Sequence, residues 1–239
     1  MENTAPSSKQ VKKAGSKVRK FFRGDSSVDL EGLDQALRTI EAHRAQFSDP
    51  LTRVNNRLRQ RLMSAGSKAR VTQRLKKMPT ILDKLRREPR LDLSRMRDIG
   101  GCRIVLDDLQ ELDHVHAAIV SNWRGGTEDP ADYVRSPRES GYRAVHCFVR
   151  DHSTRLTIEV QLRTTLMHAW AEDVENVSAR MGINYKQDGG SEYQEYMKNL
   201  SSLYEAVETG SPVPEGLADT LRTQRARIAH LVQRAERSG

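Results

Sequence analysis

Residues 158–163 alternate strictly between apolar and polar side chains, and this alternation limits the folds open to the chain. One side carries Ile158, Val160 and Leu162, and the other carries Glu159, Gln161 and Arg163. A repeat of two residues is typical of a β-strand that packs one face on a core. We therefore expect a strand at 156–162 that buries its apolar side and turns its charged side outward.

Further strands are expected at residues 100–106, which read Gly-Gly-Cys-Arg-Ile-Val-Leu, and at residues 142–149. Helical patterns surround them, with apolar residues at three- and four-residue spacing. The expected helices are 9–23, one capped by Asp29, one beginning at Ser48-Asp49-Pro50, one opened by Pro79, one spanning Leu109 to Ile119, one from about Thr164, and two at 191–208 and 214–236. Strands embedded among helices indicate an α/β or α+β fold.

The same patterns divide the chain into four parts. They are a basic N-terminal arm at 1–28, N-terminal helices at 29–67, a core at 68–190 and C-terminal helices at 191–239. Residues 124–141 are rich in Gly, Pro, Ser and charge, so we expect a mobile loop inside the core.

The positive charge of the chain is concentrated at its beginning. The formal net charge is +8, and residues 1–24 contribute +6 of it, from seven basic side chains and the single acid Glu2. A basic arm attracts polyanions such as nucleic acid. The alternative is a disordered, solvated tail that only aids solubility.

Several classes of protein are not expected. No stretch approaches the roughly 18 consecutive apolar residues of a membrane span, and the first ten residues lack the apolar segment of a secretory signal. Cys102 and Cys147 form no C-x-x-C pair, so neither a disulfide framework nor a zinc site is expected. We therefore expect a soluble, cytoplasmic protein with no membrane partner.

Two carboxylates are candidates for a shared site. Asp98 lies just before the first expected strand, and Glu159 projects from the polar side of a later one. If the two strands are neighbours, the carboxylates face each other across a cleft. Such oxygen ligands suit Mg²⁺, which takes one or two protein carboxylates together with substrate phosphates. The alternative is that each acid pairs with a nearby arginine.

Cations and one aromatic side chain complete the candidate site. Transfer of phosphoryl groups depends on positioning and charge neutralisation, which lysine and arginine supply. Tyr142, at the start of an expected strand, has the position of a ring that stacks on a nucleobase, with His146 on the same face and Arg135 and Arg138 able to meet phosphate. The candidate cations are Arg74, Lys76, Lys84 and Arg103. Ordinary surface charge, packing of the tyrosine on a sheet and a core histidine are the alternatives.

Four segments together resemble the RelA/SpoT synthetase family of alarmone pyrophosphokinases. They are RLKKMPTILDK at 74–84, RDIGGCRIV at 97–105, DYVRSPRESGYRAVH at 132–146 and IEVQLRTTLMHAWAEDVEN at 158–176. Their order and spacing are those of the family, over roughly residues 68–186. The resemblance implies an α+β fold: a mixed-sheet, nucleotidyltransferase-like core flanked by helices, with helical extensions at both ends.

The resemblance also implies a role for each site residue. Arg74 and Arg103 resemble the pair that sandwiches the adenine of ATP, and Lys76 and Lys84 resemble phosphate contacts. Asp98 and Glu159 resemble the Mg²⁺-binding acids, Glu159 being also a candidate to activate the attacking hydroxyl. On the acceptor side, the corresponding residues are Tyr142, His146, Arg138, Gln161 and Arg163. The implied reaction transfers pyrophosphate from ATP to a ribose 3′-hydroxyl and releases AMP.

The sequence departs from the family at two motif positions. Glu175-Asn176 stands where Glu-His is expected, and Thr80 stands where the family has serine. About 70 residues precede the first motif, which is too short for the hydrolase domain of the bifunctional enzymes. We therefore expect a small member with one domain, in which an oligomer is possible.

The acceptor divides small members of the family into two groups. Some act on GDP or GTP, and others are toxins that modify the 3′-terminal adenosine of tRNA and stop translation, with an antitoxin protein as a possible partner. The basic arm and the arginines of the last helix favour tRNA, and GDP or GTP is the alternative. Those arginines are Arg222, Arg225, Arg227, Arg234 and Arg237. A third possibility is an inactive RNA-binding module that keeps the fold.

Overall fold

The computed structural model describes residues 5–121, 123–181 and 191–236, and for Met181 and residues 229–236 it describes the backbone alone. Arg237 and the side chain of Arg234 lie outside this description. The helices are α1 (Ser8–Phe22), α2 (Leu30–Ala45), α3 (Ser48–Ser64), α4 (Met78–Arg87), the short 3₁₀ helix η1 (Leu93–Arg95), α5 (Leu109–Val120), α6 (Thr165–Met181), α7 (Glu192–Thr209) and α8 (Leu217–Glu236). The strands are β1 (Val71–Leu75), β2 (Gly100–Leu106), β3 (Thr127–Asp132), β4 (Val145–Arg150) and β5 (Thr157–Thr164).

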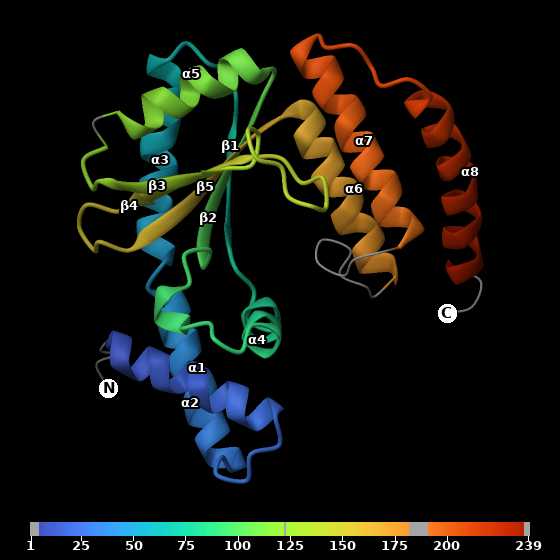
Figure 1. The fold of residues 1–239 in the computed structure, drawn as a ribbon. Helices are drawn as coiled ribbons and strands as arrows, with labels where there is room; N and C mark the ends of the chain where they lie inside the picture. The colour runs from blue at the N-terminus through green and yellow to red at the C-terminus, as the bar shows by residue number, and fades with distance from the viewer. Residues whose placement is uncertain (1–4, 122, 182–190, 237–239) are drawn as a thin grey trace.

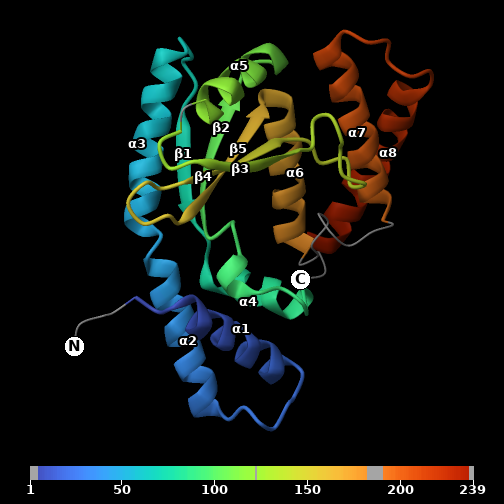
Figure 2. The same ribbon diagram turned by 60° about the vertical axis from the view of Figure 1, so that its left-hand side comes forward.

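The five strands form one mixed sheet in the order β1-β2-β5-β4-β3. The central strands β2 and β5 are parallel, with Gly101 beside Glu159, whereas the other neighbours are antiparallel. Helices α3 and α5 contact one another and the sheet, α6 also packs on β2 and β5, and the sheet runs between α3 and α6 (Figure 2). The predicted α+β class with a mixed sheet is confirmed.

Outside these layers, the two ends of the chain form helical extensions. Helices α7 and α8 pack on each other beyond α6, and the α1–α2 hairpin projects from the opposite end of the molecule (Figure 1). No helix in the described part of the chain has the length and apolarity that crossing a membrane requires.

The strands follow the period-two pattern on their apolar side. Ile104 on β2 lies beside Leu162 on β5, and both are completely buried. Each such side chain contributes about 1.5–3 kcal/mol to folding by leaving water. The polar side of β5 differs from the expectation, because Glu159 and Arg163 are 8% and 2% exposed and therefore do not face solvent. The loop before β4 and helix α6 cover this side of the sheet, so its charges lie inside a site.

The expected helix at 9–23 is present as α1, and it is packed rather than solvated. Ser7 and Gln10 form a capping box at its start, and Val11 and Val18 are fully buried against the body of the protein. Helix α1 contacts α2, α4 and η1. The alternative of a disordered tail is therefore wrong for residues 8–22, because the apolar stripe finds a core to pack against.

Two edge strands and one boundary differ from the sequence expectation. Part of the expected mobile loop is β3, whose register shifts around Pro130, as is usual for proline on an edge strand. Residues 71–75 form the other edge strand, β1, although the short basic segment lacks an alternating pattern. The strand expected from Tyr142 begins only at Val145, because the carbonyl of Tyr142 accepts from the backbone of Arg138 in a tight turn.

Candidate functional site

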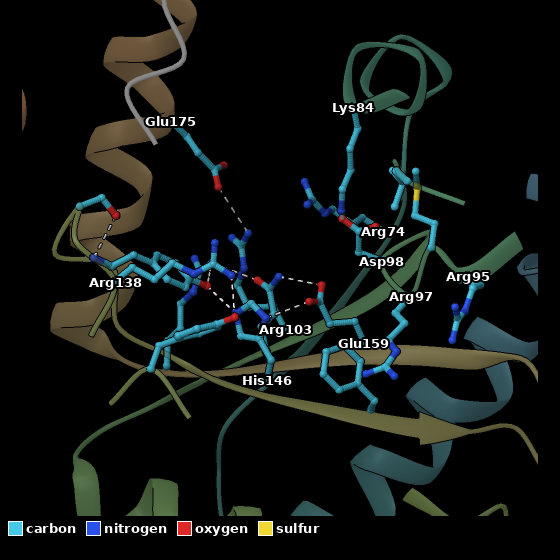
Figure 3. A pocket seen from close by; sticks show the side chains of 18 residues that line it. Arg74, Lys84, Arg95, Arg97, Asp98, Arg103, Arg138, His146, Glu159 and Glu175 are labelled. Atoms are coloured by element: carbon cyan, nitrogen blue, oxygen red, sulfur yellow. Dashed lines mark hydrogen bonds and ion pairs between the residues drawn. The ribbon is translucent and has the colours of Figure 1, made fainter. Parts of the chain in front are cut away.

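The parallel pairing of β2 and β5 brings the two predicted carboxylates together. Asp98 is separated from β2 only by Ile99, and Glu159 lies on β5 beside Gly101. Both line one cleft of about 400 Å³, and Figure 3 shows Asp98 and Glu159 on neighbouring walls of it. The cleft is lined by Arg74, Lys84, Leu91, Arg95, Met96, Arg97, Asp98, Arg103, Tyr133, Arg138, Ser140, Tyr142, His146, Phe148, Glu159, Gln161, Arg163 and Glu175.

Asp98 is held by two ammonium groups on one of its oxygens. Its Oδ2 accepts from Lys76 Nζ at 2.7 Å and from Lys84 Nζ at 3.2 Å. Burial alone would raise the pKa of Asp98, but the two charges outweigh it and hold the pKa below its usual value. The other oxygen, Oδ1, is buried without a hydrogen-bond partner. An ionised carboxylate with one oxygen unpartnered fits the binding of a cation.

Glu159 ends a chain of hydrogen bonds on the sheet. Its Oε1 lies 2.9 Å from His146 Nδ1, and its Oε2 accepts from Gln161 Nε2 at 2.9 Å. Burial raises the pKa of Glu159, but the hydrogen bond and charge of His146 outweigh it, and the pKa lies below its usual value. The tyrosine hydroxyl of Tyr142 lies 2.7 Å from His146 Nε2 and accepts from Arg163 Nη2 at 2.9 Å.

When His146 is neutral, this series of hydrogen bonds fixes which ring nitrogen carries the proton. The ionised carboxylate of Glu159 only accepts, so Nδ1 carries the proton and Nε2 accepts from the hydroxyl of Tyr142. Arg163 is the last residue in this series of hydrogen bonds, at the end away from Glu159, and is 2% exposed. Its Nε and Nη1 lack partners and it lines the cleft, which suits an anionic ligand.

Two arginines form a pair beside the carboxylates. Arg74 on β1 lies opposite Gly101, and Arg103 on β2 lies opposite Thr72, so both side chains project from the same face of the sheet as diagonal neighbours. Burial, followed by the nearby charges of Arg163 and Arg74, lowers the pKa of Arg103. Two guanidinium groups at this spacing suit a flat ligand held between them.

The opposite side of the cleft is a cluster of rings capped by a cation. Tyr142 is 9% exposed and lies 6.0 Å from Tyr133 and 6.1 Å from Trp170, measured between ring centroids. The guanidinium of Arg138 lies 4.3 Å from the centre of the Tyr133 ring and donates to the Tyr133 hydroxyl at 2.6 Å. The Tyr142 ring is thus packed among side chains in this structure.

Ten of the eleven predicted site residues line the cleft. The exception is Lys76, which is 8% exposed and lies behind Asp98 as its ion-pair partner. Arg135 is an exposed partner of Asp132 and does not line it. Sequence reasoning missed Tyr133, Arg95, Arg97, Phe148 and Glu175. Arg97, Tyr133 and Glu175 stand inside quoted motifs, so motif position is the signal that could have found them.

No group of three or more His, Cys, Asp or Glu side chains arranged to bind a metal occurs among the described residues. The candidate donors for a cation in the cleft are the two predicted carboxylates, Asp98 and Glu159. Mg²⁺ needs only one or two protein carboxylates when substrate phosphates complete its shell, so this set fits it.

Comparison with known proteins identifies the segment that carries this site. A family profile described as a region found in RelA / SpoT proteins matches residues 73–189. An uncharacterized protein of Mycobacterium tuberculosis is 34% identical over 141 residues, which cover 59% of this chain and 50% of that protein. A GTP pyrophosphokinase of Bacillus subtilis is 30% identical over 127 residues, covering 50% of this chain and 57% of that enzyme. The chain thus spans about half the length of these relatives.

Solved structures share the fold at low sequence identity. The small alarmone synthetase 2 of Bacillus subtilis superimposes with a TM-score of 0.61 at 17% identity, covering 71% of this chain and 94% of that chain. The small alarmone synthetase 1 of the same organism, bound to its product pppGpp, gives a TM-score of 0.57 at 21% identity, covering 70% and 93%. These similarities show that the architecture is that of the small synthetases.

Proposed function

The chain belongs to the RelA/SpoT family through residues 73–189, and from this premise we propose that it transfers the β,γ-pyrophosphate of ATP to a ribose 3′-hydroxyl. The observation that carries the proposal is the meeting of Asp98 and Glu159 in one arginine-lined cleft. Phosphoryl-group transfer requires this combination of carboxylates, which hold a divalent cation, and basic groups, which neutralise phosphate charge.

Each side of the cleft has a part in the reaction. Arg74 and Arg103 hold the adenine of ATP between their guanidinium planes, and Lys84 reaches the phosphates. Asp98, through its unpartnered Oδ1, and Glu159 would hold Mg²⁺, which when bound supplies charge neutralisation at the phosphates. Lys76 keeps Asp98 ionised and in position.

Glu159 takes the proton of the attacking hydroxyl. The 3′-oxygen of the acceptor forms a bond to the β-phosphorus, the bond from that phosphorus to the oxygen bridging to the α-phosphate breaks, and AMP leaves with that oxygen. His146 orients Glu159 through Nδ1, and Tyr142 and Arg163 fix His146 from the other side. The carboxylate is therefore pre-oriented before the substrates bind.

For the acceptor, the position of α1 supports the 3′ end of tRNA. Arg19 donates to the carbonyl of Leu91, which lines the cleft, and Lys12 pairs with Asp92 at 3.4 Å. The basic helix is thus fastened to the rim of the site, where a polyanionic acceptor would meet it. The protein would then inhibit translation, as a toxin with an antitoxin partner.

A guanine nucleotide is the second candidate acceptor. The observation that favours it is the printed name of the Bacillus subtilis relative, a GTP pyrophosphokinase. With this acceptor the products would be the alarmones ppGpp and pppGpp, and α1 would have no part in recognition.

Incubation with ATP labelled in its β,γ-phosphates tests the activity and the acceptor together. Label on tRNA supports the first acceptor, label on GDP or GTP supports the second, and no transfer to any of them contradicts the proposal. Glu159→Gln should abolish transfer, whereas the matched control Asp113→Asn, an exposed acid on α5, should leave it unchanged.

The role of α1 is tested without unfolding it. Lys9, Lys13 and Lys17 are exposed, so changing all three to Gln removes charge and leaves the buried stripe in place. The triple variant should lose transfer to tRNA and keep any transfer to GDP. Equal effects on both acceptors would remove the reason for preferring tRNA.

A further inference from the structure

A second hollow adjoins the cleft and has no part in the reaction described above. Its volume is about 340 Å³, and it lies where the β4–β5 hairpin and the start of β3 face the α2–α3 junction. It is lined by His43, Phe47, Ser94, Arg95, Met96, Arg97, Glu128, Arg150, Arg155, Leu156 and Thr157.

One short segment separates the second hollow from the cleft. Arg95, Met96 and Arg97 line both spaces. Figure 3 shows Arg95 and Arg97 beyond Glu159, on the side away from Arg138. A ligand that extends from Glu159 across this segment would therefore enter the second hollow.

The second hollow has an excess of positive charge. Four arginines line it, and Glu128 is its only acidic residue among those described. Arg97 and Arg150 share that carboxylate, at 3.0 and 3.3 Å, and Arg95 forms no ion pair with any described residue. The lining therefore carries three uncompensated charges, on a side chain whose planar group of N–H donors matches phosphate.

Arg155 adds a second, independent indication. Its φ of 64° makes it the only non-glycine residue with a positive φ in the described part of the chain. Glycine adopts this conformation freely, so an arginine here indicates a requirement for its side chain rather than its backbone. Its Nη1 donates to the carbonyl of Gly125 at 2.8 Å, and that bond uses one of five N–H donors.

We propose that the second hollow binds backbone phosphate of the nucleic-acid acceptor, next to the nucleotide whose 3′-hydroxyl reacts. The proposal rests on the proposed tRNA acceptor. In this proposal, Arg150 and Arg155 bind the phosphates. The shared segment at residues 95–97 contacts the part of the nucleic-acid backbone that runs from those phosphates to Glu159. Free nucleotide phosphates are the other source of this chemistry, and the test distinguishes the two.

The experiment measures the affinity of the full-length protein for an RNA ending in 3′-CCA as a function of salt. The variant Arg150→Gln/Arg155→Gln removes two contacts that lie outside the cleft. Each phosphate contact to a single strand contributes roughly 0.7 to the slope of log affinity against log salt. The variant should therefore lose about 1.4 from the slope, so that a fourfold rise in salt weakens the wild type about sevenfold more than the variant.

Arg59→Gln, on an exposed α3 position, is the matched control and should leave the slope unchanged. Arg155→Gly removes the same side chain while relaxing the backbone, so RNA binding should fall although thermal stability does not. An unaltered slope in the double variant would overturn the proposal. Loss of GTP binding together with unaltered RNA binding would also overturn it, and would assign the second hollow to free nucleotides.

Because binding is measured without turnover, this result is independent of the proposed reaction. A protein that transfers no label but loses salt-dependent RNA binding in the double variant would refute the function and keep the phosphate site. Labelling of tRNA by the wild type, together with an unaltered salt slope in the double variant, would support the function and refute the phosphate site.

Discussion

Arg143 and Glu208 form an ion pair that is almost completely buried between the acceptor side of the cleft and helix α7. Their side chains are 3% and 6% exposed, and Arg143 Nη1 lies 2.6 Å from Glu208 Oε2. Glu208 Oε1 also accepts from the hydroxyl of Thr164 at the end of β5. Since Arg143 follows Tyr142 in the chain, the pair fastens α7 to the ring cluster. We predict that removing either partner damages both stability and acceptor binding.

The burial of this ion pair determines how much the loss of one partner destabilises the protein. Arg143→Met leaves a carboxylate in the interior with only a hydroxyl as partner, and Glu208→Leu leaves a guanidinium whose Nε is already unpartnered. Breaking a buried pair in this way costs about 3–5 kcal/mol, out of a total stability of about 5–15 kcal/mol. For a chain of this size, that corresponds to a fall in Tm of about 6–20 °C. The double variant leaves no buried charge, so it should be more stable than either single variant.

Urea denaturation of the wild type, both single variants and the double variant gives the coupling between the two side chains. Steady-state kinetics on the folded fraction then separates the two substrates. The KM for the acceptor should rise several-fold, because the loop that carries Tyr142 is no longer held against α7 by the ion pair. The KM for ATP should stay unchanged, because Arg74 and Arg103 lie on β1 and β2. A single variant within about 1 kcal/mol of the wild type, or a double variant as unstable as the two single costs combined, would refute the reasoning.

Three further predictions concern the carboxylates and the loop. Asp98→Asn keeps the size of the side chain but removes its charge, so labelled transfer should fall by about 10³-fold, equivalent to about 4 kcal/mol; retention of more than a tenth of the activity would contradict the role of Asp98. The folded-state pKa of Asp98 is lowered, so its stabilising contribution is complete above the unfolded value of about 3.9 and is lost as the pH falls through the folded value. The difference in unfolding free energy between wild type and Asp98→Asn should thus be constant from neutral pH to about pH 5 and shrink only below about pH 4, and shrinkage near pH 6 would show that Lys76 and Lys84 do not lower this pKa. Gly141→Ala should lower the free energy of unfolding by about 1–3 kcal/mol, measured by urea denaturation. The reason is that Gly141 has a φ of +85° and that an added Cβ would lie 3.1 Å from Lys198 Cα on α7. An unchanged free energy of unfolding would mean that α7 does not confine this loop.

Local signals in the sequence were sufficient to predict most of the helices. Asp29 caps α2 by accepting from the backbone of Gly32, and Pro79 stands in the first turn of α4, as their positions predicted. Such signals act within a few residues along the chain, so they are readable without knowledge of the fold. The edge strands β1 and β3 lack a local pattern, because pairing along one side of β2 and β4 is what makes them strands.

The candidate site, like the fold, was predictable from the sequence only in part. Ten of the residues that the motifs singled out line the cleft, yet the motifs did not reveal that Lys76 is buried behind Asp98 or that Arg95 and Arg97 stand between two hollows. Burial and the sharing of a wall depend on which elements pack on the segment, and those elements are distant in sequence.

The amino-acid sequence by itself determined most helices and the central strands, the inventory of acids and bases, and the order in which the motifs occur. Tertiary structure alone decided which of those groups meet, because the parallel pairing of β2 with β5 brings Asp98 to Glu159, and α7 brings Glu208 to Arg143. The physical reason is that periodicity and capping are local properties of the backbone, whereas the burial of a charge and the choice of its partner depend on contacts between segments far apart in the chain.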